Sequence, residues 1–130
     1  MQCVAITGIA PEVIGEIRQG RPRTLDLQST HNVVTLASIN PGQTIFMTST
    51  DMEDLSPGES GIIAEVQAVS ITMKRIVEFA QGLHYEERER VSARIKVKIV
   101  CSSSVKSVAR EGWAQPITVD VVKCSCYQAG

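Results

Sequence analysis

Residues 94–101 read RIKVKIVC, and polar and apolar side chains alternate along them almost without a break. Because successive residues of a β-strand face opposite sides of its sheet, this alternation predicts a strand with one buried side. Residues 117–123, ITVDVVK, repeat the pattern near the C-terminus. The first segment is expected to turn Ile95, Val97 and Ile99 inward and Arg94, Lys96 and Lys98 outward.

Shorter apolar and β-branched runs predict further strands. These runs lie at residues 2–7, 23–28, 33–36, 44–48 and 61–73. In the last of them, Ile62, Ala64, Val66 and Ala68 form the more apolar face. Two Pro-Gly pairs, Pro41-Gly42 and Pro57-Gly58, predict turns, since proline fixes φ and glycine accepts positive φ.

One helix is expected near the N-terminus, at residues 11–19. Pro11 suits the first turn, and Val13, Ile14 and Ile17 recur at helical spacing before Gly20. Gly15 inside this helix suggests close packing against a neighbouring element. A single further helical turn is expected at residues 51–55.

Two segments are predicted to lie outside regular structure. The charged run YEERER, residues 85–90, is interpreted as a solvated loop or helix face, and residues 102–116 as a Ser- and Gly-bearing connection. The remaining elements predict an α+β, mainly β protein: one domain, residues 1–130, built as a small β-barrel with one short helix near the N-terminus. The expected core residues are Ile14, Ile17, Leu25, Leu27, Ile62, Ala64, Val66, Ile95, Val97 and Ile99.

Composition narrows the possible functions. The chain carries 13 basic and 14 acidic side chains, which excludes a strongly basic nucleic-acid module but not a local basic patch. Aromatic residues make up 4% of the chain, which counts against a binder with many base-stacking platforms. No apolar run is long enough to span a membrane, and the N-terminus lacks the basic flank of a signal peptide. A cytoplasmic protein without a membrane partner is expected.

The four cysteines predict no metal site. Cys3 and Cys101 lie in apolar, strand-like runs, where a thiol behaves as a small hydrophobe. Cys124 and Cys126 are separated by one residue, whereas structural zinc sites use a wider spacing and a second pair of ligands. The role of this pair is left open. Since no phosphate-binding loop or metal-binding histidine motif occurs either, no cofactor is predicted.

The order of motifs resembles the ASCH branch of the PUA-like superfamily. The resemblance rests on GRPRTLDL at residues 20–27, PGQTIFMTS at 41–49 and SGIIAEVQAV at 60–69. It covers roughly residues 10–75. The whole chain also looks like a family of small archaeal proteins known as domain of unknown function 473. The superfamily implies a pseudo-barrel whose mouth, beside the helix and the Gly-basic-Thr strand, receives RNA or a nucleobase.

Some ASCH relatives hydrolyse an acylated cytidine with a lysine and a threonine from this strand and a distant glutamate. With one residue inserted, Arg23 falls on the lysine, Thr24 on the threonine and Gln28 on a usual arginine. A guanidinium cannot be deprotonated in a protein, so Arg23 can orient an oxyanion but cannot act as a base. Glu86 or Glu87 would supply the carboxylate if the hydrolase chemistry is kept.

Three arginines, Arg18, Arg21 and Arg23, cluster in the segment EIRQGRPRTLDL. A guanidinium donates two parallel hydrogen bonds to phosphate, so these side chains are candidates for a phosphate-binding surface. The alternative is a solvated face paired with Glu12, Glu16 or Asp26. The candidate ligand-binding residues are Arg18, Arg21, Arg23, Thr24, Thr48 and Ser49. The last two could line a pocket or satisfy the backbone of a turn.

The favoured hypothesis is an RNA-binding or nucleotide-binding module. One alternative is an amidohydrolase acting on a modified nucleoside. Another is a protein-interaction domain that uses an exposed barrel edge, for which a large symmetric apolar interface would be the sign. The oligomeric state is left open by the sequence.

Overall fold

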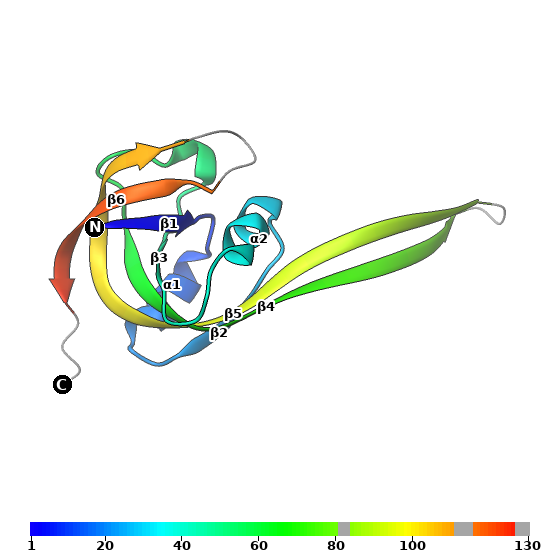
Figure 1. Ribbon diagram of the computed structural model, residues 1–130, viewed down its shortest axis with the longest axis horizontal. Helices are drawn as coiled ribbons and strands as arrows, with labels where there is room; N and C mark the ends of the chain where they lie inside the picture. The colour runs from blue at the N-terminus through cyan, green and yellow to red at the C-terminus, as the bar shows by residue number, and fades with distance from the viewer. Residues whose placement is uncertain (81–83, 111–115, 127–130) are drawn as a thin grey trace.

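The computed structural model describes residues 1–80, 84–110 and 116–126, with side chains at 1–73, 91–110 and 116–122. The chain is mainly β, with two α-helices and one short 3-10 helix (Figure 1). In chain order the elements are β1 (Gln2–Ile6), α1 (Pro11–Arg18), β2 (Arg23–Leu27), α2 (Thr30–Ala37), β3 (Thr44–Met47), η1 (Met52–Asp54), β4 (Ser60–Ala80), β5 (His84–Ala109) and β6 (Thr118–Cys126).

The strands form one sheet that closes on itself as a ring. Its order is β2-β5-β4-β3-β1-β6, and β5 also pairs with β6. The β1–β3 pair is parallel, whereas the other pairs are antiparallel. Irregularities in the β4–β5 and β5–β6 registers let β5 bend around the ring, because a bulge bends a strand and increases its twist. Strand β2 pairs only with β5 and is an edge strand.

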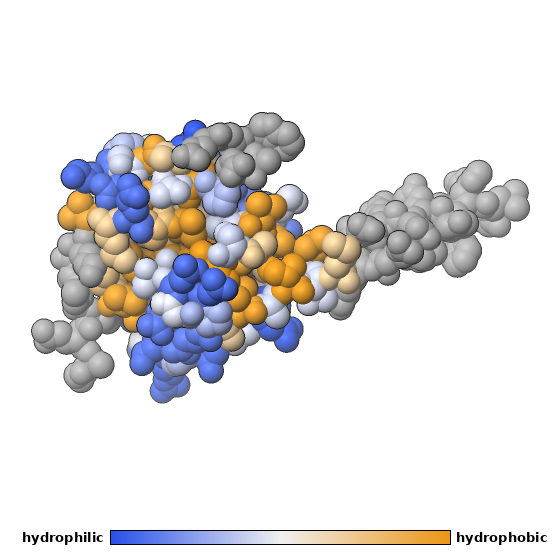
Figure 2. Space-filling view, viewed as in Figure 1, coloured by the Kyte–Doolittle hydropathy of each residue, from blue (hydrophilic) through white to orange (hydrophobic). Residues whose placement is uncertain are grey.

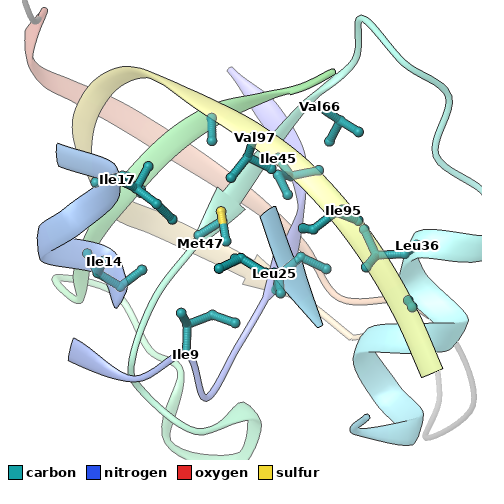
Figure 3. Close-up of a cluster of buried hydrophobic side chains, with 14 of the residues drawn as sticks. Ile9, Ile14, Ile17, Leu25, Leu36, Ile45, Met47, Val66, Ile95 and Val97 are labelled. Carbon is teal, nitrogen blue, oxygen red and sulfur yellow. The ribbon is translucent and has the colours of Figure 1, made fainter. Parts of the chain in front are cut away.

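Both helices pack on one side of the ring and close its larger hydrophobic core. Ile14 and Ile17 of α1 and Leu36 of α2 meet Leu25, Ile95 and Val97 from the strands (Figure 3). A second buried cluster, which includes Phe46, Cys101 and Val119, lies between β1, β3, β5 and β6. Of the ten expected core residues, Leu27 is half-buried and the other nine are buried.

Several sequence predictions are wrong. Residues 33–36 belong to α2 and are not an extended segment, because burial of Val33, Thr35 and Leu36 outweighs the strand preference of the β-branched valines and threonine. Residues 85–90 lie in β5 rather than in a loop or helix, and β5 continues through Ala109 into the predicted connection. Residues 111–115 of that connection are outside the described structure.

Two local expectations also differ from the structure. Ala68 is exposed because the register shift between Val66 and Ala68 reverses the alternation, so that Val69 turns inward and is half-buried. Gly15 meets no heavy atom within 4 Å of an added Cβ, so it is not a site of close packing. In the part of the chain with described side chains, no helix is long and apolar enough to cross a membrane.

Beyond the ring, β4 and β5 continue together as a two-stranded arm (Figure 1). The arm comprises residues 72–80 and 84–92, which pair from Thr72–Ser92 to Ala80–His84. The pairing of β2 with β5 ends at Ala93, so among the described residues no third strand accompanies the arm.

Candidate functional site

Three pockets follow one another along β2 and the ends of the parallel strands. A central pocket of about 410 Å³ lies between residues 8–10 and Val13 on one side and β2 on the other. Gly8 also lines an acidic pocket of about 420 Å³. Thr24 of β2 also lines a cationic pocket of about 210 Å³. The shared residues place the central pocket between the other two.

The acidic pocket is built where β1 and β3 end. Its lining residues are Thr7, Gly8, Ser29, His31, Asn32, Asp51, Met52 and Glu53. The two strands are parallel and leave the ring on the same side, so the segments that follow them lie together. Gly8 has φ of +67°, and its N–H donates to the carbonyl oxygen of Thr50 over 3.0 Å. This backbone conformation suits glycine.

Hydrogen-bond acceptors dominate the acidic pocket. Asp51 and Glu53 contribute exposed carboxylates. Burial lowers the pKa of His31, the charge of Arg110 adds to this effect, and a backbone hydrogen bond to Ala5 opposes it. The imidazole is therefore neutral near pH 7. Its inaccessible Nε2 atom has no hydrogen-bond partner among the described residues. The pocket suits a ligand that donates N–H groups or carries positive charge.

The central pocket is lined by every residue of β2. Leu25 is buried, so strand alternation places Arg23 on the inner face of β2 and Thr24 and Asp26 on the outer face. Arg23 forms an ion pair with Glu16 of α1, while its Nε atom has no partner in the described part of the chain. Both side chains of this pair are partly exposed, so it contributes little to stability.

The cationic pocket lies on the outer face of β2, β4 and β5. It is lined by Thr24, Ala68, Val69, Ser70, Arg94 and Lys96. The Nε of Arg94 donates to Oδ1 of Asp26 over 2.9 Å. Lys96, by contrast, stands opposite Thr24 and Ala68, and its ammonium group has no ion pair with any described residue. Lys96 thus supplies an uncompensated positive charge beside two hydroxyl groups.

The three arginines of the predicted phosphate surface have different surroundings. Nη1 of Arg18 donates to Oγ of Ser102 over 2.7 Å, and Arg23 is paired with Glu16. Arg21 is exposed and has no ion pair or hydrogen bond among described residues. Of the three, Arg23 alone lines a pocket described above.

The two predicted hydroxyl residues after β3 lie outside the three pockets. Thr48 is buried, and its Oγ1 donates to the carbonyl oxygen of Ser60 and accepts from the N–H of Thr50. Its hydroxyl therefore satisfies the backbone of the turn, which was the alternative interpretation. Ser49 is exposed at the start of the same turn.

The residues of the hydrolase hypothesis are spread apart. Arg23 and Thr24 face opposite sides of β2. The backbones of Glu86 and Glu87 lie in the arm, where they pair with Glu78 and Val77. Ala93, where β2 pairing ends, lies six positions after Glu87 along β5, which is roughly 20 Å in a strand. The side chains of both glutamates are outside the described structure.

Most of the residues that line the acidic and cationic pockets were not predicted from the sequence. None of His31, Asp51 and Glu53 is a candidate site residue in the sequence, where residues 51–55 predict only a single helical turn. The missing information was the parallel pairing of β1 with β3, a contact between distant segments. Lys96 was placed correctly at the surface, but the absence of an acidic neighbour becomes visible only from the strand register.

The described cysteines agree with their expected role. Cys3 and Cys101 are both buried, and burial raises the pKa of Cys3 to about 11. These thiols pack as small hydrophobes, as predicted. The side chains of Cys124 and Cys126 lie outside the described structure. Among the residues that it covers, no group of three His, Cys, Asp or Glu side chains could hold a metal ion.

Comparison with known proteins identifies a family, a distant relative in sequence and a solved structure of similar fold. The family model described as a protein of unknown function, DUF473, matches residues 1–119. An uncharacterised protein of Methanocaldococcus jannaschii is 27% identical over 100 residues, which are 77% of this chain and 62% of that protein. The N-terminal domain of Lon protease from the Mycobacterium avium complex is similar in fold, with a TM-score of 0.52 at 14% identity. That match covers 100% of this chain and 58% of the Lon chain.

Proposed function

Because the chain belongs to DUF473, a family described as being of unknown function, we propose a function from its pockets. The domain is a PUA-like module that binds single-stranded RNA, or a nucleotide from it, across the cationic, central and acidic pockets. The predicted assignment to DUF473 is confirmed, whereas the PUA-like and ASCH assignments are part of this proposal.

The opposite chemistry of the two outer pockets carries the proposal. The cationic pocket offers Lys96, Arg94 and two hydroxyl groups, which suit an anionic phosphate. The acidic pocket offers the carboxylates of Asp51 and Glu53, which suit the amino groups on the edges of cytosine, adenine or guanine, and the neutral imidazole of His31 adds no opposing charge. A nucleotide joins these two chemistries in one molecule, and the central pocket would hold the sugar between them.

The arrangement of elements gives secondary support to a PUA-like module. Helix α1 lies beside β2, and the Gly-basic-Thr segment enters that strand next to the central pocket. The resemblance predicts that RNA or a nucleobase is received at this place. The likeness to the Lon N-terminal domain concerns the fold alone.

Amide hydrolysis is less well supported. Arg23 cannot accept a proton, and Thr24 lies on the other face of the strand. Neither Glu86 nor Glu87 is positioned near β2 by the described backbone.

Fluorescence anisotropy with short labelled homopolymer RNAs over a salt series tests the proposal. Each phosphate contact with a single strand contributes about −0.7 to the slope of log affinity against log salt. Lys96→Ala should therefore weaken binding to all sequences and flatten this slope by about 0.7. Asp51→Asn should change the preference between cytosine-containing and uracil-containing RNA while leaving the slope unchanged.

Lys106→Ala is the matched control, since Lys106 is an exposed lysine in the part of β5 that pairs with β6. It should bind as the unaltered protein does. Absence of binding to any RNA or mononucleotide would overturn the proposal. Equal effects of the two lysine substitutions would overturn the assignment of the cationic pocket.

A further inference from the structure

The central pocket lies along the unpaired edge of β2. It is lined by all five residues of this strand, whose side chains alternate between the two faces of the sheet. No residue of β5, the partner on the other edge of β2, lines it. Residues 8–10 and Val13 stand across the pocket. Because the pocket touches both faces of β2 but not its partner strand, it lies beside the free edge.

The backbone groups that face this edge follow from the strand register. The N–H of Val66 donates to the carbonyl oxygen of Gln43 over 2.9 Å, and its own carbonyl oxygen accepts from the N–H of Gly42 over 2.7 Å. Val66 thus directs both groups away from β5. Opposed residues of an antiparallel pair either bond to each other or both point away. Val97, the partner of Val66, therefore directs its N–H and C=O toward β2.

Alternation along β2 then separates its bonded residues from its free ones. Arg23 pairs with Val97, so residues 23, 25 and 27 bond to β5, whereas Thr24 and Asp26 direct N–H and C=O toward the free edge. These four groups have no hydrogen bond with any residue whose structure is described. Thr24 also lines the cationic pocket, and Ser29 lines the acidic one. The backbone of Asp26 therefore lies between the two outer pockets.

A ribose hydroxyl group has the chemistry that this edge requires. A hydroxyl both donates and accepts, so it can bond to the C=O and the N–H of one strand residue. The ribose 2′-hydroxyl is such a group, and deoxyribose lacks it. Figure 2 shows mainly hydrophilic surface over α1 and β2, which suits a polar ligand.

An extended peptide also pairs with an edge strand, but through a row of successive bonds. Here the free groups belong to two residues, Thr24 and Asp26, and a pocket of charged side chains lies toward each end of the strand. These features favour a single sugar over a peptide strand.

We propose that the free backbone of Asp26, with that of Thr24 beside it, recognises the ribose 2′-hydroxyl and makes the site selective for ribonucleotides over deoxyribonucleotides. This inference rests on the proposed binding of RNA and adds its sugar specificity. The donor and the acceptor are both backbone groups, so the selectivity does not depend on the side chain at position 26.

Fluorescence anisotropy with labelled oligocytidylate, as RNA and as DNA of the same length, tests this selectivity. RNA should bind about tenfold more tightly, since deoxyribose loses two hydrogen bonds of ordinary strength. RNA with 2′-fluoro groups should lose part of this advantage, because fluorine cannot donate to the carbonyl oxygen. Lys96→Ala should weaken the binding of RNA and DNA by the same factor, because both carry the same phosphates.

A proline substitution places the recognition on the backbone. Asp26→Pro removes the N–H that faces the pocket, and an edge strand tolerates proline where this group points away from the sheet. RNA should then bind only about threefold more tightly than DNA, because one of the two hydrogen bonds is lost. Asp26→Ala is the matched control. It loses the carboxylate and its ion pair with Arg94 but keeps the backbone, so the tenfold preference should remain.

Equal affinity of the unaltered protein for RNA and DNA would overturn the sugar selectivity and leave RNA binding itself in place. Binding of neither nucleic acid would overturn the proposed function as well. An unchanged preference in a folded Asp26→Pro protein, checked by circular dichroism, would also contradict the inference. If this variant does not fold, the 2′-fluoro RNA decides, since its binding as tightly as RNA would exclude donation to the strand.

Discussion

The carboxamide of Asn32 completes the backbone of β1 after its last strand residue. The N–H of Thr7 donates to Oδ1 of Asn32 over 3.1 Å, and Nδ2 of Asn32 donates to the carbonyl oxygen of Thr7 over 2.9 Å. Both groups are buried, so each bond also removes the cost of an unsatisfied polar atom. This single side chain ties α2 to the end of β1 and thereby fixes His31 at the acidic pocket.

Folding stability should fall on acidification because of His31. Its pKa is lowered in the folded protein by burial, whereas an unfolded chain restores the ordinary value of about 6.5. As the pH falls through about 6.5, the unfolded chain binds the proton more readily, so the free energy of unfolding decreases. Urea unfolding at pH 7.5 and pH 5.5 measures this decrease.

A His31→Gln variant isolates the contribution, since the chain has one other histidine, His84. The variant should lose less stability between the two pH values than the unaltered protein does. An identical pH dependence in both proteins would show that His31 is protonated equally in the folded and unfolded states.

At the scale of elements, the sequence correctly predicted the strands and the helix that bury one face and expose the other. The alternation at residues 94–101 and 117–123 correctly predicted parts of β5 and β6, and the period of α1 was equally clear. Helix α2 was not predicted, because valine and threonine favour strands. It forms because Val33 and Leu36 are buried in the larger hydrophobic core, which the sequence alone does not show. The charged run at residues 85–90 lacks an alternation of polar and apolar residues, so the sequence gives no sign of its strand pairing.

Substitution by alanine should have opposite effects on stability at two glycines, one in β4 and one in α1. A Cβ at Gly61 of β4 would lie 2.5 Å from the carbonyl oxygen of Met47 and 2.6 Å from the ring of Phe46. Gly61→Ala should therefore destabilise the protein by about 1–3 kcal/mol or more, because backbone and a buried ring cannot both yield.

Gly15→Ala is its counterpart on the exposed face of α1, where an added Cβ meets nothing within 4 Å. This change should stabilise the protein by about 0.5–1 kcal/mol, since alanine loses less conformational freedom in a helix. Thermal unfolding of both variants provides the comparison. A stabilised Gly61→Ala protein would mean that Phe46 packs elsewhere.

At the scale of the whole molecule, ring closure joins segments that the sequence keeps far apart. Strand β5 pairs with β2, β4 and β6, and the parallel β1–β3 contact crosses α1, β2 and α2. No local pattern encodes such pairings, so the β-rich class was predictable but the position of the pockets was not. The candidate arginines lie in one segment of the sequence and could be identified there. The positions of Lys96 and Asp51 beside their pockets, by contrast, depend on the register of β5 with β2 and on the parallel pairing of β1 with β3.

The ring should fold without the arm. Strands β2, β3 and β6 pair with β4 and β5 outside residues 74–90, so the strand pairing of the ring does not involve the removed segment. Met73 and Val91 are cross-strand partners, so replacing residues 74–90 by Asn-Gly joins them through a turn that suits a two-residue hairpin. The shortened protein should keep its β-rich circular dichroism spectrum and its RNA affinity.

Denaturant unfolding distinguishes a ring that is stable alone from one that needs the arm. The shortened protein should unfold in a single cooperative transition, because it retains the strand pairings of the ring. A shortened protein that is unfolded would show instead that the arm contributes to the stability of the ring itself.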